Sequence, residues 1–176
     1  MSYVPSHQPS RTVAQPNALT VIEHSTSTTQ GITTGNRIEI GTVHNWHGSF
    51  SPTISTNQIT LPSGYYYYVE SMINAYISGT YSMSSYVSYQ HYNETGSANI
   101  GVPATLFAGY YEDSVTLSRD ACARALIDCT SAAMTISLKV TGNTGNFDKI
   151  NYSAPASDQD YAGFGRTVIW QLEDAP

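Results

Sequence analysis

The chain has 176 residues, of which only 11% are charged, and its formal net charge at neutral pH is −6. An acidic balance of this size disfavours broad attraction to nucleic acid phosphates or anionic lipid, so we expect neither nucleic acid nor membrane as a partner. The length suits one folded domain with an appended segment. A surface built largely from uncharged polar side chains favours packing beside further copies of the same protein or binding of neutral sugars.

The N-terminal segment, residues 1–36, differs in composition from the rest of the chain. Prolines recur in its first half, and a run of Ser and Thr residues follows. Because so little apolar surface cannot support independent folding, we predict an extended arm over 1–36 and a folded domain over 37–176. The arm either has no role or becomes ordered on a partner surface. Its expected partner contacts are Tyr3, Val4, Leu19, Val21 and Ile22.

The first twenty residues lack the basic start and apolar block of a signal peptide, and no apolar run is long enough to cross a membrane. Cys122 and Cys129 are the only cysteines, too few for a disulfide scaffold. If the segment between them is helical, their Cα atoms are about 10 Å apart along the axis, too far for a disulfide. We therefore expect free thiols in a chain made in a reducing cytoplasm.

From residue 37 onward, apolar and polar residues mostly alternate, which is the period of a β-strand. The clearest example follows the turn signal Pro62-Ser63-Gly64, where four tyrosines begin a strand and line both of its faces. One tyrosine face is expected against a core and the other against a subunit or ligand. Strands are predicted near residues 37–43, 47–50, 57–61, 65–77, 83–91, 104–117, 133–141, 147–153 and 164–173. So many short strands predict an all-β sandwich or barrel.

The alanine-rich segment 118–132 is the exception to this pattern. It lacks Gly and Pro and begins with a plausible cap at Ser118, so we predict one short helix or turn there. The last predicted strand, 164–173, is strongly apolar on one face, which favours a central position in a sheet. Rings that keep a hydroxyl or indole N–H suit protein interfaces. The residues expected at an oligomer interface are Tyr66, Tyr68, Tyr110 and Trp170.

The strand that begins at Leu61-Pro-Ser-Gly-Tyr-Tyr-Tyr-Tyr-Val69 resembles a strand of complement C1q-like and tumour necrosis factor-like domains. His47-Gly-Ser-Phe50 before it and Gly163-Phe-Gly-Arg-Thr-Val-Ile-Trp170 near the end also fit that pattern. The resemblance spans about residues 40–173. It implies a jelly roll that packs as a homotrimer around apolar and aromatic residues. Related jelly rolls form trimeric heads of bacteriophage fibres and capsid decoration proteins.

Candidate chemistry is sparse. His44 and His47 would point to opposite faces of a strand and so could not share a metal there. Asp158 and Asp160, with Glu112-Asp113, could offer oxygen ligands to calcium, although such loops are commonly solvated turns. We find no nucleophile elbow, phosphate loop or dinucleotide fingerprint. We therefore expect no enzyme, cofactor or resident metal, with a small hydrolase as a remote alternative.

These observations lead to a structural virion protein of a bacteriophage, either a capsid decoration protein or a head fibre. The jelly roll is expected to oligomerise, and the arm to attach it to the major capsid protein or another virion protein. The alternative is a receptor-binding fibre head that recognises a host glycan or surface protein.

Overall fold

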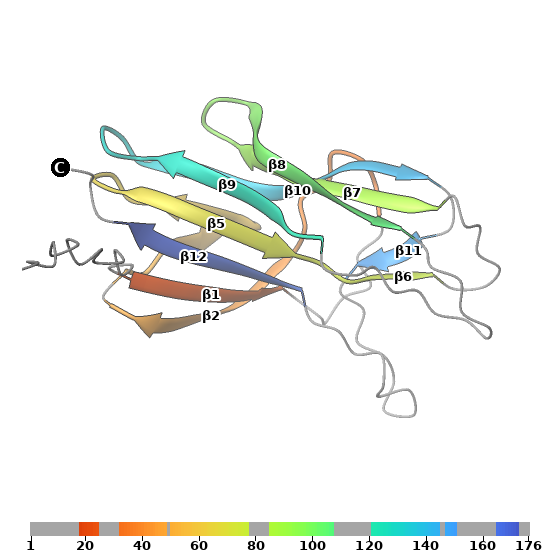
Figure 1. The fold of residues 1–176 in the computed structure, drawn as a ribbon, viewed down its shortest axis with the longest axis horizontal. Helices are drawn as coiled ribbons and strands as arrows, with labels where there is room; N and C mark the ends of the chain where they lie inside the picture. Colours follow the sequence, from red (N-terminus) through yellow and green to blue (C-terminus); the bar gives the residue numbers. More distant parts are fainter. Residues whose placement is uncertain are drawn as a thin grey trace, which may run out of the picture.

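A computed structural model describes residues 18–24, 32–48, 50–77, 85–107, 121–144, 147–150 and 165–172. These residues form strands, turns and extended segments (Figure 1). Within these ranges no helix has the length and apolar character needed to span a membrane.

Ten of the described strands form one antiparallel sheet in the order β2-β1-β12-β5-β9-β8-β7-β10-β4-β3, and β11 pairs with β6 beside it. The first half of the sheet contains β1 (Ala18–His24), β2 (Ile40–His47), β5 (Tyr66–Met72), β9 (Ala123–Asp128) and β12 (Arg166–Leu172). The second half contains β3 (Thr53–Ser55), β4 (Gln58–Leu61), β7 (Tyr86–Asn93), β8 (Ala98–Phe107) and β10 (Met134–Thr144). The small pair is β6 (Ala75–Ile77) and β11 (Phe147–Ile150).

The sheet curls so that its two halves, here called the first and second layers, share a core. Figure 1 shows β2, β1, β12, β5 and β9 side by side in the first layer. One buried cluster joins Ile22 and Val69 of this layer to Ile59 and Ile136 of the second. Alternation along the strands produces this core, because every second side chain points inward.

Two glycines permit tight backbone geometry, one before β5 in the first layer and one in β8 of the second. Gly64 has a φ of 99°, and its N–H donates to the Cys129 carbonyl at 2.8 Å, so the predicted turn before β5 is confirmed. Gly101 has a φ of 71° where β8 passes β9. A Cβ there would lie 2.0 Å from the Arg124 carbonyl oxygen, so only glycine allows this approach between the layers.

The predicted arm is too long. β1 lies between β2 and β12, and its Ile22 is fully buried in the core. The chain also joins the fold before residue 37, since the Val140 N–H donates to the Asn36 carbonyl at 3.1 Å. The expectation that Ile22 contacts another protein is therefore wrong, because its side chain already packs within this one.

The predicted helix is also wrong over Ala123–Asp128, which is strand β9. Its burial alternates regularly, with Ala123, Ala125 and Ile127 inward. Helix propensity favoured the alanines, but small side chains are required where β8 approaches β9, as the Cβ built at Gly101 would lie 2.7 Å from that of Ala125. Cys122 and Cys129 are both free, as expected, although the helical reasoning behind that expectation does not apply.

The other predicted strands differ from the observed strands mainly in their boundaries. The segments predicted at 37–43 and 47–50 are replaced by a single strand, β2, and the long strand predicted at 65–77 is interrupted between β5 and β6. β3 was not predicted. The last strand, β12, is central in the sheet as predicted, between β1 and β5.

Candidate self-association surface

The outward side chains of β1, β12, β5 and β9 form one continuous face, here called the first outer face. Each of these strands alternates buried positions with positions that are partly or fully exposed. The apolar and aromatic residues on this face are Leu19, Val21, Tyr66, Tyr68, Met72, Leu126, Val168, Trp170 and Leu172.

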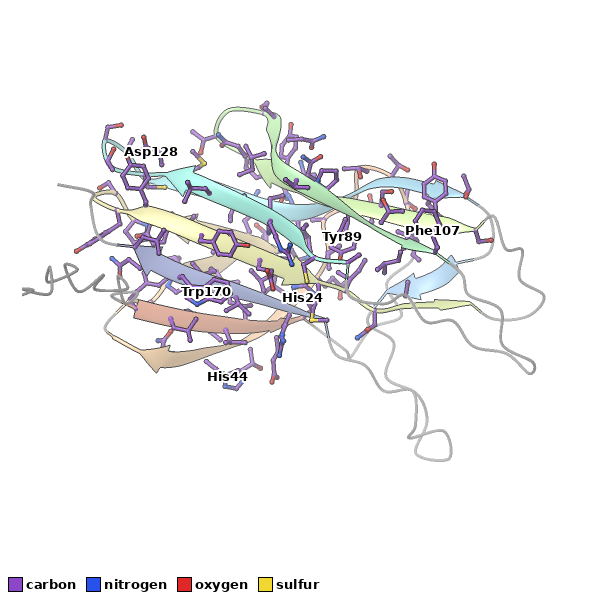
Figure 2. All side chains as sticks on the ribbon, in the orientation of Figure 1. His24, His44, Tyr89, Phe107, Asp128 and Trp170 are labelled. Atoms are coloured by element: carbon purple, nitrogen blue, oxygen red, sulfur yellow. The ribbon has the colours of Figure 1, made fainter. Side chains whose placement is uncertain are left out.

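The registers align these side chains in rows across the strands. Leu19 is paired with Trp170, Trp170 with Tyr68, and Tyr68 with Leu126. The rings of Tyr68 and Trp170 lie 5.3 Å apart at 45°, a favourable tilted contact. Leu126, at the end of the row, is 68% exposed. Four neighbouring strands therefore present an unbroken apolar row, with Trp170 labelled in Figure 2.

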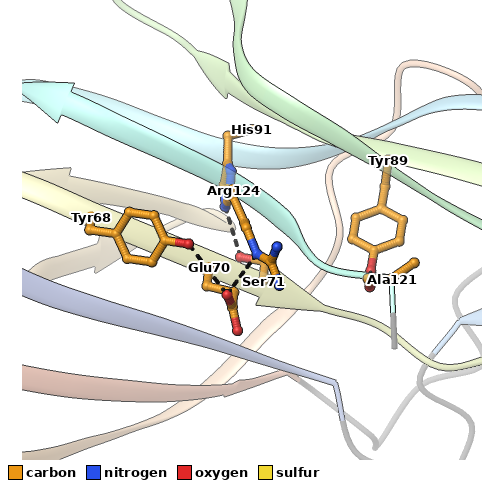
Figure 3. Close-up of polar contacts among 7 residues, drawn as sticks. All are labelled: Tyr68, Glu70, Ser71, Tyr89, His91, Ala121 and Arg124. Carbon is orange, nitrogen blue, oxygen red and sulfur yellow. Dashed lines mark hydrogen bonds and ion pairs between the residues drawn. The ribbon is translucent and has the colours of Figure 1, made fainter. Parts of the chain in front are cut away.

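A second row adds charge beside this apolar centre. Val168 is paired with Glu70, and Glu70 with Arg124. Glu70 accepts a hydrogen bond from the Arg124 guanidinium at 2.8 Å and a longer one from the Tyr68 hydroxyl at 3.5 Å (Figure 3). The Glu70 carboxylate raises the pKa of Arg124. The charged groups are thus paired with each other at the margin of the apolar row.

The face continues onto β8 through Val102, which pairs with Arg124 and is 63% exposed. Isolated apolar residues on a surface are ordinary, but a contiguous group spanning several strands marks an interaction site. An aromatic and aliphatic centre with a polar margin is the usual composition of protein–protein interfaces, in which Trp, Tyr and Arg are enriched. The geometry therefore suits binding to another protein surface.

The structure brings together several residues that were predicted separately. Tyr66, Tyr68 and Trp170, predicted at an oligomer interface, share the first outer face. Leu19 and Val21, predicted as partner contacts of the extended arm, lie on that same face in β1. The interface role of all five stays a prediction. Tyr3, Val4 and Tyr110 lie outside the described residues.

Sequence reasoning missed Leu126, Leu172 and the Glu70–Arg124 pair. Leu126 was hidden by the helix prediction for its segment. The signal was present, since Arg124, Leu126 and Asp128 alternate with three small or apolar residues that are buried. If this alternation with a period of two had been given more weight than the alanine content, it would have identified both the strand and its exposed leucine.

The described ranges contain no group of three His, Cys, Asp or Glu side chains able to hold a metal. His44, on β2, lies 3.5 Å from the Glu23 carboxylate. Asp158, Asp160, Glu112 and Asp113 are not among the described residues. Burial raises the thiol pKa of both Cys122 and Cys129, which makes them weak nucleophiles.

No known protein family and no curated protein matches this sequence. Among solved structures, the chain is similar to the Eiger TNF from S. frugiperda, with a TM-score of 0.52 and 13% sequence identity. The similarity covers 92% of this chain and 96% of that one. The fold is a TNF-like jelly roll. The predicted fold class is therefore confirmed apart from the helical segment, and at this identity the likeness concerns the fold alone.

Proposed function

We propose that this protein is a non-enzymatic structural protein of a virus particle, a capsid decoration or fibre-head protein of a bacteriophage. In this proposal its jelly roll assembles as a homotrimer through the first outer face. The segment before β1, which includes Tyr3 and Val4, attaches the assembly to the major capsid protein or another virion protein.

The observation that carries the proposal is the row formed by Leu19, Trp170, Tyr68 and Leu126. Water is a poor solvent for such a row, and burying apolar area yields about 25 cal/mol for each Å² removed from water. A second copy of the same face offers the same mixture of rings and aliphatic groups. A rotational assembly of identical copies buries the face in every subunit.

The low charge of the chain supports assembly into a dense particle, since 11% charged residues leave few like charges to repel neighbouring copies. Trimerisation strengthens attachment through a short segment, because each assembly then carries three such segments. Linked arms raise the effective strength of weak contacts by roughly 10²–10⁴-fold. Because β1 begins at Ala18, the attachment segment is now limited to about residues 1–17.

The self-association part is tested by Leu126→Glu, with solution mass measured by light scattering. We expect the unmodified protein near three times the chain mass of 19.1 kDa, and the variant near one chain mass with an unchanged circular dichroism spectrum. Phe107→Glu is a matched control. Phe107 is 60% exposed but lies on β8, far from Trp170 in Figure 2, and its variant should keep the larger mass.

The attachment part is tested by deleting residues 1–16, which leaves β1 intact. The deleted protein should fold and self-associate normally but fail to join particles when it is produced together with the other virion proteins. Normal incorporation would refute attachment through this segment. If purified protein instead blocks adsorption of the virus to host cells, the receptor-binding alternative replaces the decoration role.

A further inference from the structure

Four buried polar side chains form a continuous hydrogen-bonded network inside the sandwich. The Nε2 atom of His24 lies 2.9 Å from the Thr167 hydroxyl, which lies 2.7 Å from the Ser71 hydroxyl. Ser71 in turn lies 2.9 Å from Nε2 of His91, as the dashed line in Figure 3 shows. The four residues are at most 3% exposed. We call this group the buried network.

The network links the two layers. His24, Thr167 and Ser71 project inward from β1, β12 and β5 of the first layer, whereas His91 projects inward from β7 of the second. Thr167 and Ser71 are directly paired across β12 and β5. Ile73, two residues after Ser71, belongs to one buried apolar cluster, and Val69, two residues before it, belongs to the other. The network therefore lies at the boundary between two apolar parts of the core.

The number of protons available for hydrogen bonding determines the tautomers of the two imidazole rings. The network has three hydrogen bonds, but its two hydroxyls supply only two protons. One neutral histidine must therefore donate from Nε2, and the other must accept at Nε2 and hold its proton on Nδ1. Each hydroxyl then donates once and accepts once. The two rings are therefore in opposite tautomers, and each of the three hydrogen bonds has one proton while both rings are neutral.

One added proton disrupts this arrangement. If the accepting ring is protonated, four protons compete for three hydrogen bonds. If the donating ring is protonated, the new proton is on Nδ1, and neither Nδ1 atom has a partner in the described part of the chain. In both cases protonation adds a buried charge and a further proton that has no acceptor in the network, which is costly in an apolar interior. Burial lowers the pKa of His24 to about 3, with a further contribution from His91, and lowers that of His91 to about 4.

No described neighbour offers a compensating negative charge. On the packed strands, Glu23 of β1, Glu70 of β5 and Arg166 of β12 occupy outward positions, as do Arg124 of β9 and Lys139 of β10. The described inward titratable groups are Tyr67, Tyr89, Cys129 and the network's own histidines, and burial raises the pKa of both tyrosines and of the thiol. The Tyr89 hydroxyl donates to the Ala121 carbonyl (Figure 3). A histidinium formed here would have no carboxylate partner among these groups.

We propose that the buried network is an acid-sensitive switch, in which protonation of His24 or His91 separates the two layers and releases the contacts of the first outer face. The same strands connect both events, since Thr167 and Ser71 lie on the inner faces of β12 and β5, whose outer faces hold Trp170 and Tyr68. The release of subunits rests on the proposed self-association; the loss of folding does not.

The first test is the unfolding equilibrium constant of the unmodified protein, measured by urea titration at a fixed concentration between pH 6 and pH 5. Because the folded pKa values lie below the unfolded value of 6.5, stability is complete above pH 6.5 and falls with acid. The constant should rise by close to tenfold per histidine for each pH unit, and thus by up to about a hundredfold per chain. Carboxylates such as Glu94 lose their contribution only below about pH 4.5. A flat profile in this window overturns the switch.

The second test removes the titrating groups. In the double variant His24→Gln and His91→Gln, the amide nitrogen can replace Nε2 but takes up no proton, so the profile should become nearly flat. His44→Gln, at a half-exposed histidine on β2, should retain the profile of the unmodified protein. If the double variant does not fold, nitrogen NMR of the unmodified protein still decides. Opposite tautomers for His24 and His91 near pH 7 support the network, and identical tautomers contradict it.

Solution mass measured over the same pH range separates the two proposals. A trimer at pH 7 with a flat stability profile refutes the switch alone. A monomer at pH 7 with a steep profile refutes the self-association alone and leaves the acid-sensitive fold standing. A trimer that keeps its mass below the pH of unfolding contradicts the link between them.

Discussion

The outward faces of the two layers differ in the groups they expose: paired polar groups on the second layer and apolar groups on the first. On the second layer, hydroxyls pair with one another, with Ser88 and Thr105 at 2.8 Å and Thr60 and Thr135 at 3.1 Å. On the first layer, the corresponding positions hold partly exposed rings and aliphatic groups, among them Trp170 and Leu126. A face whose polar groups pair with each other and with water needs no partner, whereas an exposed apolar row gains from one.

The contacts of Glu94 show that charged groups of the second layer are paired with one another. Its carboxylate lies 2.8 Å from the Arg37 guanidinium, 3.1 Å from the Lys139 ammonium and 2.6 Å from the Ser137 hydroxyl. These contacts, led by Arg37, lower the pKa of Glu94 to about 2. Lys139 also lies 3.3 Å above the Tyr92 ring, a cation–π contact. Of the two outward faces, the first outer face is therefore the one available to a partner.

The largest expected effect follows from removing β12, because this strand supplies the centre of the first outer face and part of the core beneath it. A chain that ends before Thr167 loses the strand between β1 and β5, together with the buried Ile169. We expect no folded protein, measured by circular dichroism and by recovery of soluble material. A soluble truncated chain with a cooperative melting transition would show that β12 is dispensable.

Gly101→Val should have the next largest effect. The added side chain meets the Arg124 carbonyl and Ala125 where the layers join, and the φ of 71° disfavours a β-branched residue. We expect a loss of about 3 kcal/mol or more in the free energy of unfolding, measured by urea titration. Gly64→Val is a useful comparison. Its φ is 99° but nothing lies within 4 Å of the added Cβ, so the loss should be smaller.

The two faces are compared directly by removing one aromatic ring from each. Trp170→Ser should weaken self-association by about 2 kcal/mol or more, roughly thirtyfold, because central tryptophans dominate interface energies. Tyr92→Ser, on the outer face of the second layer, should leave association unchanged. Sedimentation over a range of protein concentrations measures both constants. Equal weakening by the two substitutions would remove the distinction between the faces.

Glu94→Gln should have the smallest effect, a destabilisation of about 1–3 kcal/mol from lost charge-assisted hydrogen bonds. Because the folded pKa of Glu94 is lowered, its contribution is present above pH 4.5 and is lost as pH falls toward 2. The variant and the unmodified protein should therefore differ in melting temperature at pH 7 and converge near pH 2. A constant difference across this range would show that the charge of Glu94 is not responsible.

The parts of the fold that follow the strand period were predictable from sequence, including β5, with Tyr67 inward and Tyr66 and Tyr68 outward. β1 was missed for a physical reason. Two of its four inward residues, Thr20 and His24, are polar and fully buried, so its sequence lacks the usual contrast between core and surface positions. The partners that satisfy His24 are distant in sequence, with Thr167 143 positions away.

The candidate surface was predictable only in part. Ring-rich strands suggested Tyr68 and Trp170, but their contact depends on the register of β5 and β12, which the sequence does not specify. The surface position of Leu126 could be predicted only if β9 was recognised as a strand. Its small inward residues are explained by the approach of Gly101 from another strand, a tertiary constraint that overrides the helix propensity of alanine.

In the proposed assembly, the first outer face is buried against further copies of the same chain. Light scattering of the unmodified protein at neutral pH, over a range of concentrations, measures whether this assembly forms. We expect a stable mass near three times 19.1 kDa. A mass of one chain at every concentration would contradict it.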